Sequence, residues 1–214
     1  MKTDTLIINE IFYSIQGEST FSGIPTVFVR LTGCPLRCQY CDTSYAFTEG
    51  IKMTFDEILN EVGKYNCNFI TVTGGEPLAQ KNTNNLLNKL VKKFNVSLET
   101  SNALSIKDVN ENVNIVLDIK TPGSGEVDKN LVDNYEYLAK NHQLKFVICN
   151  HSDYVWSKNY IYEYELHKRC EILFSPSNQE MNIKVLAEKI LEDHIPARLQ
   201  VQLHKIIWND QRGK

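Results

Sequence analysis

Residues 27 to 43 read Val-Phe-Val-Arg-Leu-Thr-Gly-Cys-Pro-Leu-Arg-Cys-Gln-Tyr-Cys-Asp-Thr, a strand-like run followed by a loop with three cysteines. Cys34, Cys38 and Cys41 lie within eight residues of one another. Three clustered thiolates can bind three irons of a cubane iron–sulfur cluster, for which cysteine is the usual ligand. Because no fourth cysteine stands at a comparable spacing, one iron would stay open to a small molecule. The stretch therefore predicts a reactive metal centre at the end of a strand.

The cysteine spacing leaves two other interpretations open, a structural zinc site and three plain thiols. Structural zinc takes four ligands, often from two Cys-x-x-Cys pairs, and here one such pair exists, Cys38 and Cys41. His142, His151 and His167 lie far away along the chain, without ligand spacing. A disulfide framework is also disfavoured, because 6 cysteines in 214 residues are not disulfide-dense.

Strand-like and helix-like segments alternate along the chain. The predicted strands are 27–31, 69–73, 96–99, 114–118, 144–148, 172–174 and 199–203, and the predicted helices are one from Thr54, 84–94, 130–140, 153–166 and 181–193. The first helix opens with a capping box, in which Thr54 is the N-cap and Glu57 follows three residues later. This alternation predicts an α/β fold of βαβ units with a mostly parallel sheet. About seven strands would close partly into a TIM-like barrel, and we expect residues 1–214 to form one domain.

Composition and charge exclude several classes of protein. The net charge of −3 argues against a nucleic-acid partner, since nucleic-acid-binding proteins usually carry a basic patch or stripe. The N-terminus has no apolar stretch of signal-peptide length, and no segment approaches the roughly 20 apolar residues of a membrane helix. We therefore expect a cytoplasmic protein without a membrane partner, in a compartment that keeps thiols reduced.

Polar clusters follow several of the predicted strands, at residues 34–43, 74–77, 99–101, 118–120 and 175–176. Chemistry in α/β barrels collects at the C-terminal ends of the strands, so we expect these clusters to converge on one rim. The cluster Gly74-Gly75-Glu76-Pro77 is the second informative motif, because two glycines let a ligand approach the backbone closely. Alone, it is equally compatible with an ordinary strand-to-helix turn.

The cysteine triad and the Gly-Gly-Glu-Pro motif, one strand apart, together resemble the radical S-adenosylmethionine (SAM) superfamily. The resemblance implies a 4Fe–4S cluster on Cys34, Cys38 and Cys41, with SAM chelating the open iron and its amino group on the glycine motif. One electron from the cluster would then cleave SAM to a 5′-deoxyadenosyl radical that abstracts hydrogen from substrate. The whole chain would be a single radical SAM domain on a partial (β/α) TIM-like barrel with a shortened core.

A narrower resemblance covers roughly residues 8 to 213, through segments 14–20, 28–34, 40–43, 72–78, 98–101, 118–125 and 199–208. These segments are similar to the 7-carboxy-7-deazaguanine synthase (QueE) family of queuosine biosynthesis. That family converts 6-carboxy-5,6,7,8-tetrahydropterin into 7-carboxy-7-deazaguanine, with ring contraction and loss of ammonia. The resemblance further implies Mg²⁺, a homodimer and an external, flavodoxin-like electron donor.

The resemblance also assigns site residues position by position. SAM would be bound by Tyr40, Asp42, Gly75, Glu76, Asp118, Ile119, Lys120, Ser175, Pro176, Ser177 and Asn178, and the pterin by Ile15, Gln16, Gly17, Arg30 and Thr73. Thr43 would bind Mg²⁺, a hard cation that prefers oxygen ligands. Arg30 can form a bidentate pair with the substrate carboxylate, and we add Glu18 as an acceptor for the amino-pyrimidine edge.

Two rival functions compete with this assignment. Another radical SAM enzyme, such as a glycyl-radical activase or a lyase acting on a related 7-deazaguanine, would share the cysteine triad. It would not need Arg30 and Thr43 as a carboxylate and magnesium pair. A non-catalytic, metal-stabilised binding module is the second rival, but a structural metal site does not explain the Gly-Gly-Glu-Pro segment.

Overall fold

A single curved sheet organises the molecule in the computed structural model, which describes residues 4–178, 180–209 and 211–214. Within these residues the strands are β1 (Thr5–Ile15), β2 (Pro25–Leu31), β3 (Ile51–Thr54), β4 (Phe69–Gly74), β5 (Asn95–Ser101), β6 (Val113–Ile119), β7 (Gln143–Ile148), β8 (Glu171–Pro176) and β9 (Arg198–Leu199). Their order across the sheet is β3-β1-β2-β4-β5-β6-β7-β8-β9. Strand β1 is antiparallel to both neighbours, and β2 and β4 to β9 run parallel.

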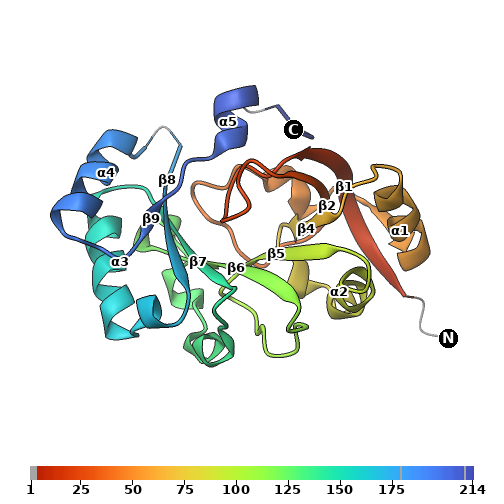
Figure 1. Ribbon diagram of the computed structural model, residues 1–214, viewed down its shortest axis with the longest axis horizontal. Coiled ribbons are helices and arrows are strands. Elements are labelled where there is room, and N and C mark those ends of the chain that lie inside the picture. Colours follow the sequence, from red (N-terminus) through yellow and green to blue (C-terminus); the bar gives the residue numbers. More distant parts are fainter. Residues whose placement is uncertain (1–3, 179, 210) are drawn as a thin grey trace.

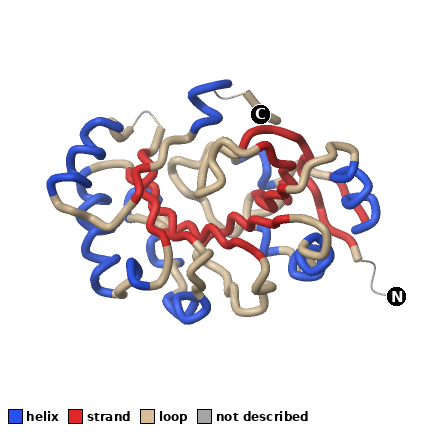
Figure 2. Tube along the Cα trace, in the orientation of Figure 1, coloured by secondary structure: helices blue, strands red, loops and turns tan. Residues whose placement is uncertain are grey.

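Helices α1 to α4 lie on the outer side of the curved sheet, whereas long loops and α5 lie on its inner, open side (Figure 1). They are α1 (Phe55–Gly63), α2 (Thr83–Leu90), α3 (His151–Glu163), α4 (Ile183–Glu192) and α5 (Leu203–Trp208). Short 3₁₀ turns occur at Ser44–Phe47, Pro77–Ala79, Pro122–Ser124, Val127–Lys129, Val132–Tyr137 and Leu166–Lys168. The strands form an open crescent in Figure 2, as the partial barrel predicts, and β3 and β9 are its edges among the described residues. No helix of that part of the chain is long and apolar enough to span a membrane.

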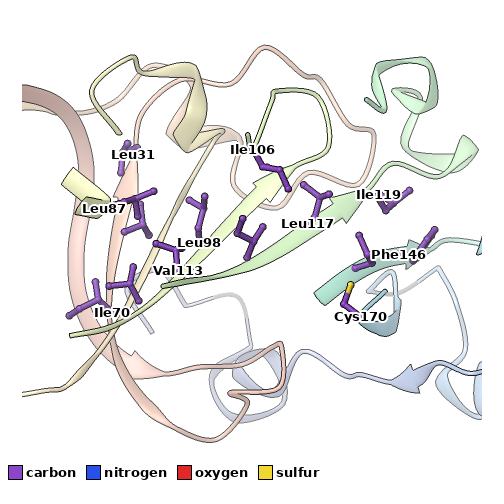
Figure 3. Packing of buried hydrophobic residues seen from close by; sticks show 14 of the residues in the cluster. Leu31, Ile70, Leu87, Leu98, Ile106, Val113, Leu117, Ile119, Phe146 and Cys170 are labelled. Atoms are coloured by element: carbon purple, nitrogen blue, oxygen red, sulfur yellow. The ribbon is translucent and has the colours of Figure 1, made fainter. Parts of the chain in front are cut away.

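Alternation along the parallel strands gives the sheet one apolar and one polar face. In β6, Ile115, Leu117 and Ile119 are buried in the hydrophobic core, whereas Val116 and Asp118 line a cavity on the opposite face. Successive side chains of a strand point to opposite faces, so the core lies between the sheet and the outer helices (Figure 3). The inner face carries the polar side chains of these strands, beside a few apolar ones such as Val116.

The capping box at α1 is confirmed. Glu57 N donates to Thr54 Oγ1 at 3.3 Å, and Thr54 N donates back to the Glu57 carboxylate at 2.7 Å. The other predicted helices over 84–94, 153–166 and 181–193 correspond to α2, α3 and α4 with shifted ends.

The predicted helix over 130–140 is wrong. The segment forms a 3₁₀ turn at Val132–Tyr137, and its central Asn134 bonds to the backbone of another loop. Its side-chain oxygen accepts from Ile106 N at 3.0 Å and its nitrogen donates to Leu104 O at 2.9 Å. Tertiary hydrogen bonds of an asparagine therefore replace a helix for which the residue has low propensity.

The chain ends differently from the predicted strand at 199–203, which is wrong beyond Leu199. Strand β9 stops there, and α5 begins at Leu203. The side chain of Gln200 accepts from Ser19 N at 2.9 Å. The C-terminal segment therefore leaves the sheet to contact the loop between β1 and β2.

Candidate active site

A cavity of about 490 Å³ lies on the polar face, at the C-terminal ends of the parallel strands. Its walls include predicted residues from the N-terminal loop, the cysteine loop and the ends of five strands: Ile15, Gln16, Glu18, Arg30, Cys34, Cys38, Tyr40, Cys41, Asp42, Thr43, Thr73, Gly75, Asp118, Lys120, Ser175, Pro176, Ser177 and Asn178. The predicted convergence of the polar clusters on one rim is thereby confirmed. Three predicted residues, Gly17, Glu76 and Ile119, do not line the cavity.

The glycine motif sets the position of the cysteine loop. Glu76 N donates to Gly33 O at 2.8 Å, and Gly75 N donates to Leu31 O at 3.1 Å. A Cβ on Gly75 would lie 2.4 Å from Gly33 O and 2.8 Å from Cys34 Cβ. The two backbones therefore touch where the cysteine loop leaves β2, and a side chain at residue 75 would separate them.

The three cysteines fit a cluster better than a single metal ion. All three are free thiols that line the same cavity, yet no three His, Cys, Asp or Glu of the described residues converge as single-ion ligands. A cubane presents three separate irons to three separate sulfurs, whereas zinc gathers its ligands around one point. Burial raises the pKa of the Cys34 and Cys38 thiols, and the nearby ammonium of Lys120 opposes this by favouring thiolate.

Glu76 lies beneath the cavity and is fully buried. One carboxylate oxygen accepts from Leu78 N at 2.8 Å and from Thr100 Oγ1 at 2.6 Å. The other accepts from the backbone N and the Oγ of Ser101, both at 2.6 Å. Burial raises the pKa of this carboxyl, and the hydrogen bonds partly offset the rise. The side chain thus joins the end of β4 to β5.

An ion-pair network crosses the floor of the cavity. Lys145 of β7 places Nζ 2.8 Å from Glu18 Oε2 and 3.6 Å from Asp118 Oδ2, and Lys120 Nζ lies 3.2 Å from that same Asp118 oxygen. Burial raises the pKa of Glu18, but Lys145 and the amide of Gln202 outweigh it, so this pKa lies below its ordinary value. Glu18 is therefore ionised at neutral pH.

Glu99 of β5 occupies the same polar face beside Glu18. Its carboxylate accepts from Thr73 Oγ1 at 3.0 Å and from Gln16 Nε2 at 3.1 Å. Burial, and then the charge of Glu18, raise the pKa of Glu99, while Lys145 lowers it. Neighbouring carboxyls whose pKa values are shifted in opposite directions are typical of functional sites.

Arg30 is held at another wall by an acidic and aromatic pocket. Its Nε donates to Glu10 Oε1 at 2.8 Å, and its guanidinium lies 5.8 Å from the Phe12 ring and 5.9 Å from the Tyr45 ring. Planar guanidinium groups stack on aromatic faces and match carboxylates bidentately. The arrangement fixes the orientation of Arg30 at the cavity wall.

Asp42 and Thr43 complete the end of the cysteine loop. Thr43 Oγ1 donates to Asp42 Oδ1 at 2.8 Å, and Lys205 of α5 pairs with Asp42 Oδ2 at 3.1 Å. Burial raises the pKa of Asp42, but the charge of Lys205 and the Thr43 hydrogen bond bring it below its ordinary value. Two oxygen-bearing side chains therefore stand together beside Cys41.

The other predicted residues take less direct positions. Ile119 is buried in the core behind β6. The carbonyl of Gly17 accepts from Leu203 N at 2.9 Å, and a Cβ on Gly17 would lie 2.0 Å from His204 Nδ1. The C-terminal segment therefore packs against Gly17, and His204 contacts the loop between β1 and β2 at this residue.

Several cavity residues were not among the predicted site residues: Phe12, Phe28, Lys145, Gln202, His204, Lys205 and Lys214. Glu99 was expected at the rim as part of the cluster 99–101, but without a role. Lys145 could have been found from strand alternation, because it lies one residue after the apolar core position Leu144. Lys205 and Lys214 come from the C-terminal segment, and no pattern in the sequence places that segment over the cavity.

Comparisons with known proteins agree with this site. The family model of the radical SAM superfamily matches residues 28–123. The chain is 44% identical to the 7-carboxy-7-deazaguanine synthase of Chlorobaculum tepidum, over 97% of each chain. It is 36% identical to the synthase of that name from Koribacter versatilis, over 95% of this chain and 97% of the relative.

The fold matches a solved structure at lower identity. The crystal structure of QueE from Escherichia coli superposes with a TM-score of 0.75 at 21% identity, covering 94% of this chain and 95% of that one. The chain therefore shares the fold of that structure. With the two close relatives, these findings show that the chain belongs to the radical SAM superfamily and, within it, to the 7-carboxy-7-deazaguanine synthase family.

Proposed function

We propose that this chain converts 6-carboxy-5,6,7,8-tetrahydropterin into 7-carboxy-7-deazaguanine with loss of ammonia, as a lyase of queuosine and 7-deazapurine biosynthesis. The relatives that carry this name cover nearly the whole chain. The observation that carries the proposal is the shared cavity, which the cysteine triad lines together with Arg30 and Glu18. One space thus offers a cluster site, a cation for a carboxylate and an acceptor for an amino-pyrimidine.

The superfamily uses a 4Fe–4S cluster and SAM, which when bound supply the one-electron chemistry that removes hydrogen from substrate. Cys34, Cys38 and Cys41 would hold the cluster. The SAM contacts we propose are the cavity residues Tyr40, Asp42, Gly75, Asp118, Lys120, Ser175, Pro176, Ser177 and Asn178. Glu76 and Ile119 would contribute through the backbone they fix, since their side chains are buried away from the cavity.

The pterin would lie between β2 and the loop of residues 16–24 that connects β1 to β2. Arg30 would pair with its carboxylate, as guanidinium groups do. Glu18, kept ionised by Lys145, would accept hydrogen bonds from the amino-pyrimidine edge. The remaining contacts we propose are Ile15, Gln16 and Thr73, with Gly17 holding the loop in place.

Mg²⁺ would bind at Thr43, beside Asp42. Mg²⁺ prefers oxygen ligands and keeps several waters, and Thr43 Oγ1 stands 2.8 Å from a carboxylate oxygen at the cavity wall. We further propose a cytoplasmic homodimer that receives electrons from an external flavodoxin-like donor.

Turnover tests the proposed function directly. Anaerobically reconstituted protein, given SAM, a reductant and 6-carboxy-5,6,7,8-tetrahydropterin, is expected to release ammonia and form 7-carboxy-7-deazaguanine. An EPR change on adding SAM would report SAM at the cluster. A SAM-responsive cluster without ammonia or deazapurine product would instead indicate another radical SAM reaction, and a SAM-insensitive cluster would indicate a binding module.

The magnesium site is tested by Thr43→Val, which removes the hydroxyl and keeps the shape of the side chain. We expect lower activity and a higher Mg²⁺ concentration for half-maximal rate, because one oxygen ligand is lost. Full activity with unchanged Mg²⁺ dependence would contradict the assignment. Thr48→Val, at an exposed position that does not line the cavity, is the matched control.

A further inference from the structure

Lys145 is the charged group at the centre of the cavity floor. Its side chain is 16% exposed, and its ammonium contacts Glu18 at 2.8 Å and Asp118 at 3.6 Å. Asp118 has a second cation, Lys120, at 3.2 Å. Among the described residues, Lys145 is the ion-pair partner of Glu18. The amide of Gln202 also donates a neutral hydrogen bond to Glu18, from Nε2 at 2.8 Å. Removal of Lys145 would therefore affect Glu18 more than Asp118.

The groups around Glu18 decide its protonation. Lys145 faces it from β7, Glu99 from β5, and His204 from α5. A buried pair of carboxyls without a cation cannot both stay ionised, since like charges and burial both favour the neutral form. With Lys145 present, Glu18 keeps its charge and its pKa is lowered, whereas the pKa of Glu99 is raised.

We propose that Lys145 is a positioning residue that holds Glu18 as an ionised acceptor and so sets selectivity for a ligand edge with two adjacent N–H donors. The inference rests on the proposed function and names how that site recognises its substrate. The 2-amino-pyrimidinone edge of a pterin has two such donors. A carboxylate can accept from both at once, whereas a protonated carboxyl offers one donor and fewer acceptors.

The test compares Lys145→Met with wild type by anaerobic calorimetry of pterin binding. The unpaired Glu18 is expected to take up a proton, and the pterin Kd to rise by at least about tenfold, as when one partner of a buried charge pair is truncated. Lys145→Arg is expected to restore part of the affinity, because arginine stays charged. Lys158→Met, which breaks a partly exposed pair with Asp193 on the outer side, is the matched control and should leave the Kd unchanged.

Two readouts separate this role from a merely structural one. In wild type, pterin binding should persist as the pH falls below the ordinary carboxyl range, because the Glu18 pKa is lowered. In Lys145→Met the affinity should be lost at a higher pH, since the folded pKa of Glu18 rises. Wild type should also bind a 2-deaminated (lumazine-type) analogue much more weakly than the pterin, and the variant should discriminate less.

A double-mutant cycle keeps the proposal falsifiable if Lys145→Met alone folds poorly. Glu18→Gln/Lys145→Met removes both charges, so it should bind the pterin no more weakly than Glu18→Gln alone. Additive losses, or a Lys145→Met protein with wild-type Kd and pH profile, would overturn the role of Lys145. A wild-type protein that binds no pterin would instead overturn the proposed function, which is a distinguishable failure.

Discussion

Gly75 shows how a single missing side chain supports the chemistry of its neighbour. Its backbone packs against Gly33 and Cys34 so closely that a Cβ would meet both within 3 Å. Gly75→Ala should therefore push the cysteine loop outward and lower the cluster content of the protein. Iron and acid-labile sulfide per chain after anaerobic reconstitution are the measurement, and wild-type values would contradict this reading.

Gly63→Ala is the matched control for that substitution. Gly63 is the last residue of α1, and nothing lies within 4 Å of where its Cβ would be. Alanine is favoured over glycine in a helix by up to about 1 kcal/mol. The control should keep full iron content and unfold at the same or a slightly higher temperature.

At the same scale, the sequence identified site residues that belong to contiguous motifs. It did not identify the role of single polar residues that lie within strands. Cys34 and Thr43 stand in one loop whose spacing is informative by itself. Lys145 is a single polar residue within a strand, and Glu99 was expected at the rim only as part of a cluster, without a role. The role of each depends on which face of the sheet carries the cavity. That face is decided by the packing of helices on the other side, a long-range property that no local window contains.

Between elements, Glu76 joins the end of β4 to β5. Each of its carboxylate oxygens accepts from a backbone N–H, one from Leu78 and the other from Ser101. In Glu76→Gln, whichever way the amide turns, its NH₂ must face one of these donors. An unsatisfied buried donor costs about 1–3 kcal/mol, and urea unfolding should show a loss of this size.

Glu188→Gln on α4 is the corresponding control. Glu188 is 54% exposed and pairs loosely with Lys184 at 3.7 Å. Such surface substitutions usually change stability by no more than about 0.5 kcal/mol. Equal stability of the two variants would mean that Glu76 is not the link between the strands.

Elements were predictable where local chemistry decides them. The capping box of Thr54 and the core strands β2, β4 and β6 follow from caps and apolar runs. Strand β1 was missed, because a register shift between Ile8 and Glu10 interrupts its alternation. The segment around Asn134 fails as a helix for the opposite reason, since distant backbone groups take its side chain.

Over the whole molecule, the gap of the partial barrel is crossed by the loop between β1 and β2. Thr20 N donates to Gln143 Oε1 at 2.8 Å at the start of β7, and Ser19 N donates to Gln200 at 2.9 Å beyond β9. The C-terminal segment then contacts the same loop, where Leu203 N donates to Gly17 O. Side-chain hydrogen bonds thus join the N-terminal and C-terminal parts of the sheet without a closed ring of strands.

Arg212 holds the end of the chain against β1 and the segment just before β3. It pairs with Glu49 at 2.9 Å and Glu10 at 3.3 Å, and its guanidinium lies 4.0 Å from the Tyr45 ring. Glu10 is also the carboxylate that anchors Arg30. Arg212→Met should therefore loosen both the tail and the orientation of Arg30, raising the KM for the pterin several-fold while kcat changes little.

Stability is the measurement that separates this effect from general damage. Arg212 is 45% exposed, and exposed ion pairs contribute little to folding, so the unfolding temperature should stay close to wild type. Lys184→Met, which removes an exposed cation on α4, should leave both KM and unfolding temperature unchanged. An unchanged KM in Arg212→Met would mean that Glu10 holds Arg30 without the tail. A fall in kcat at constant KM would mean instead that the tail acts after the substrate is bound.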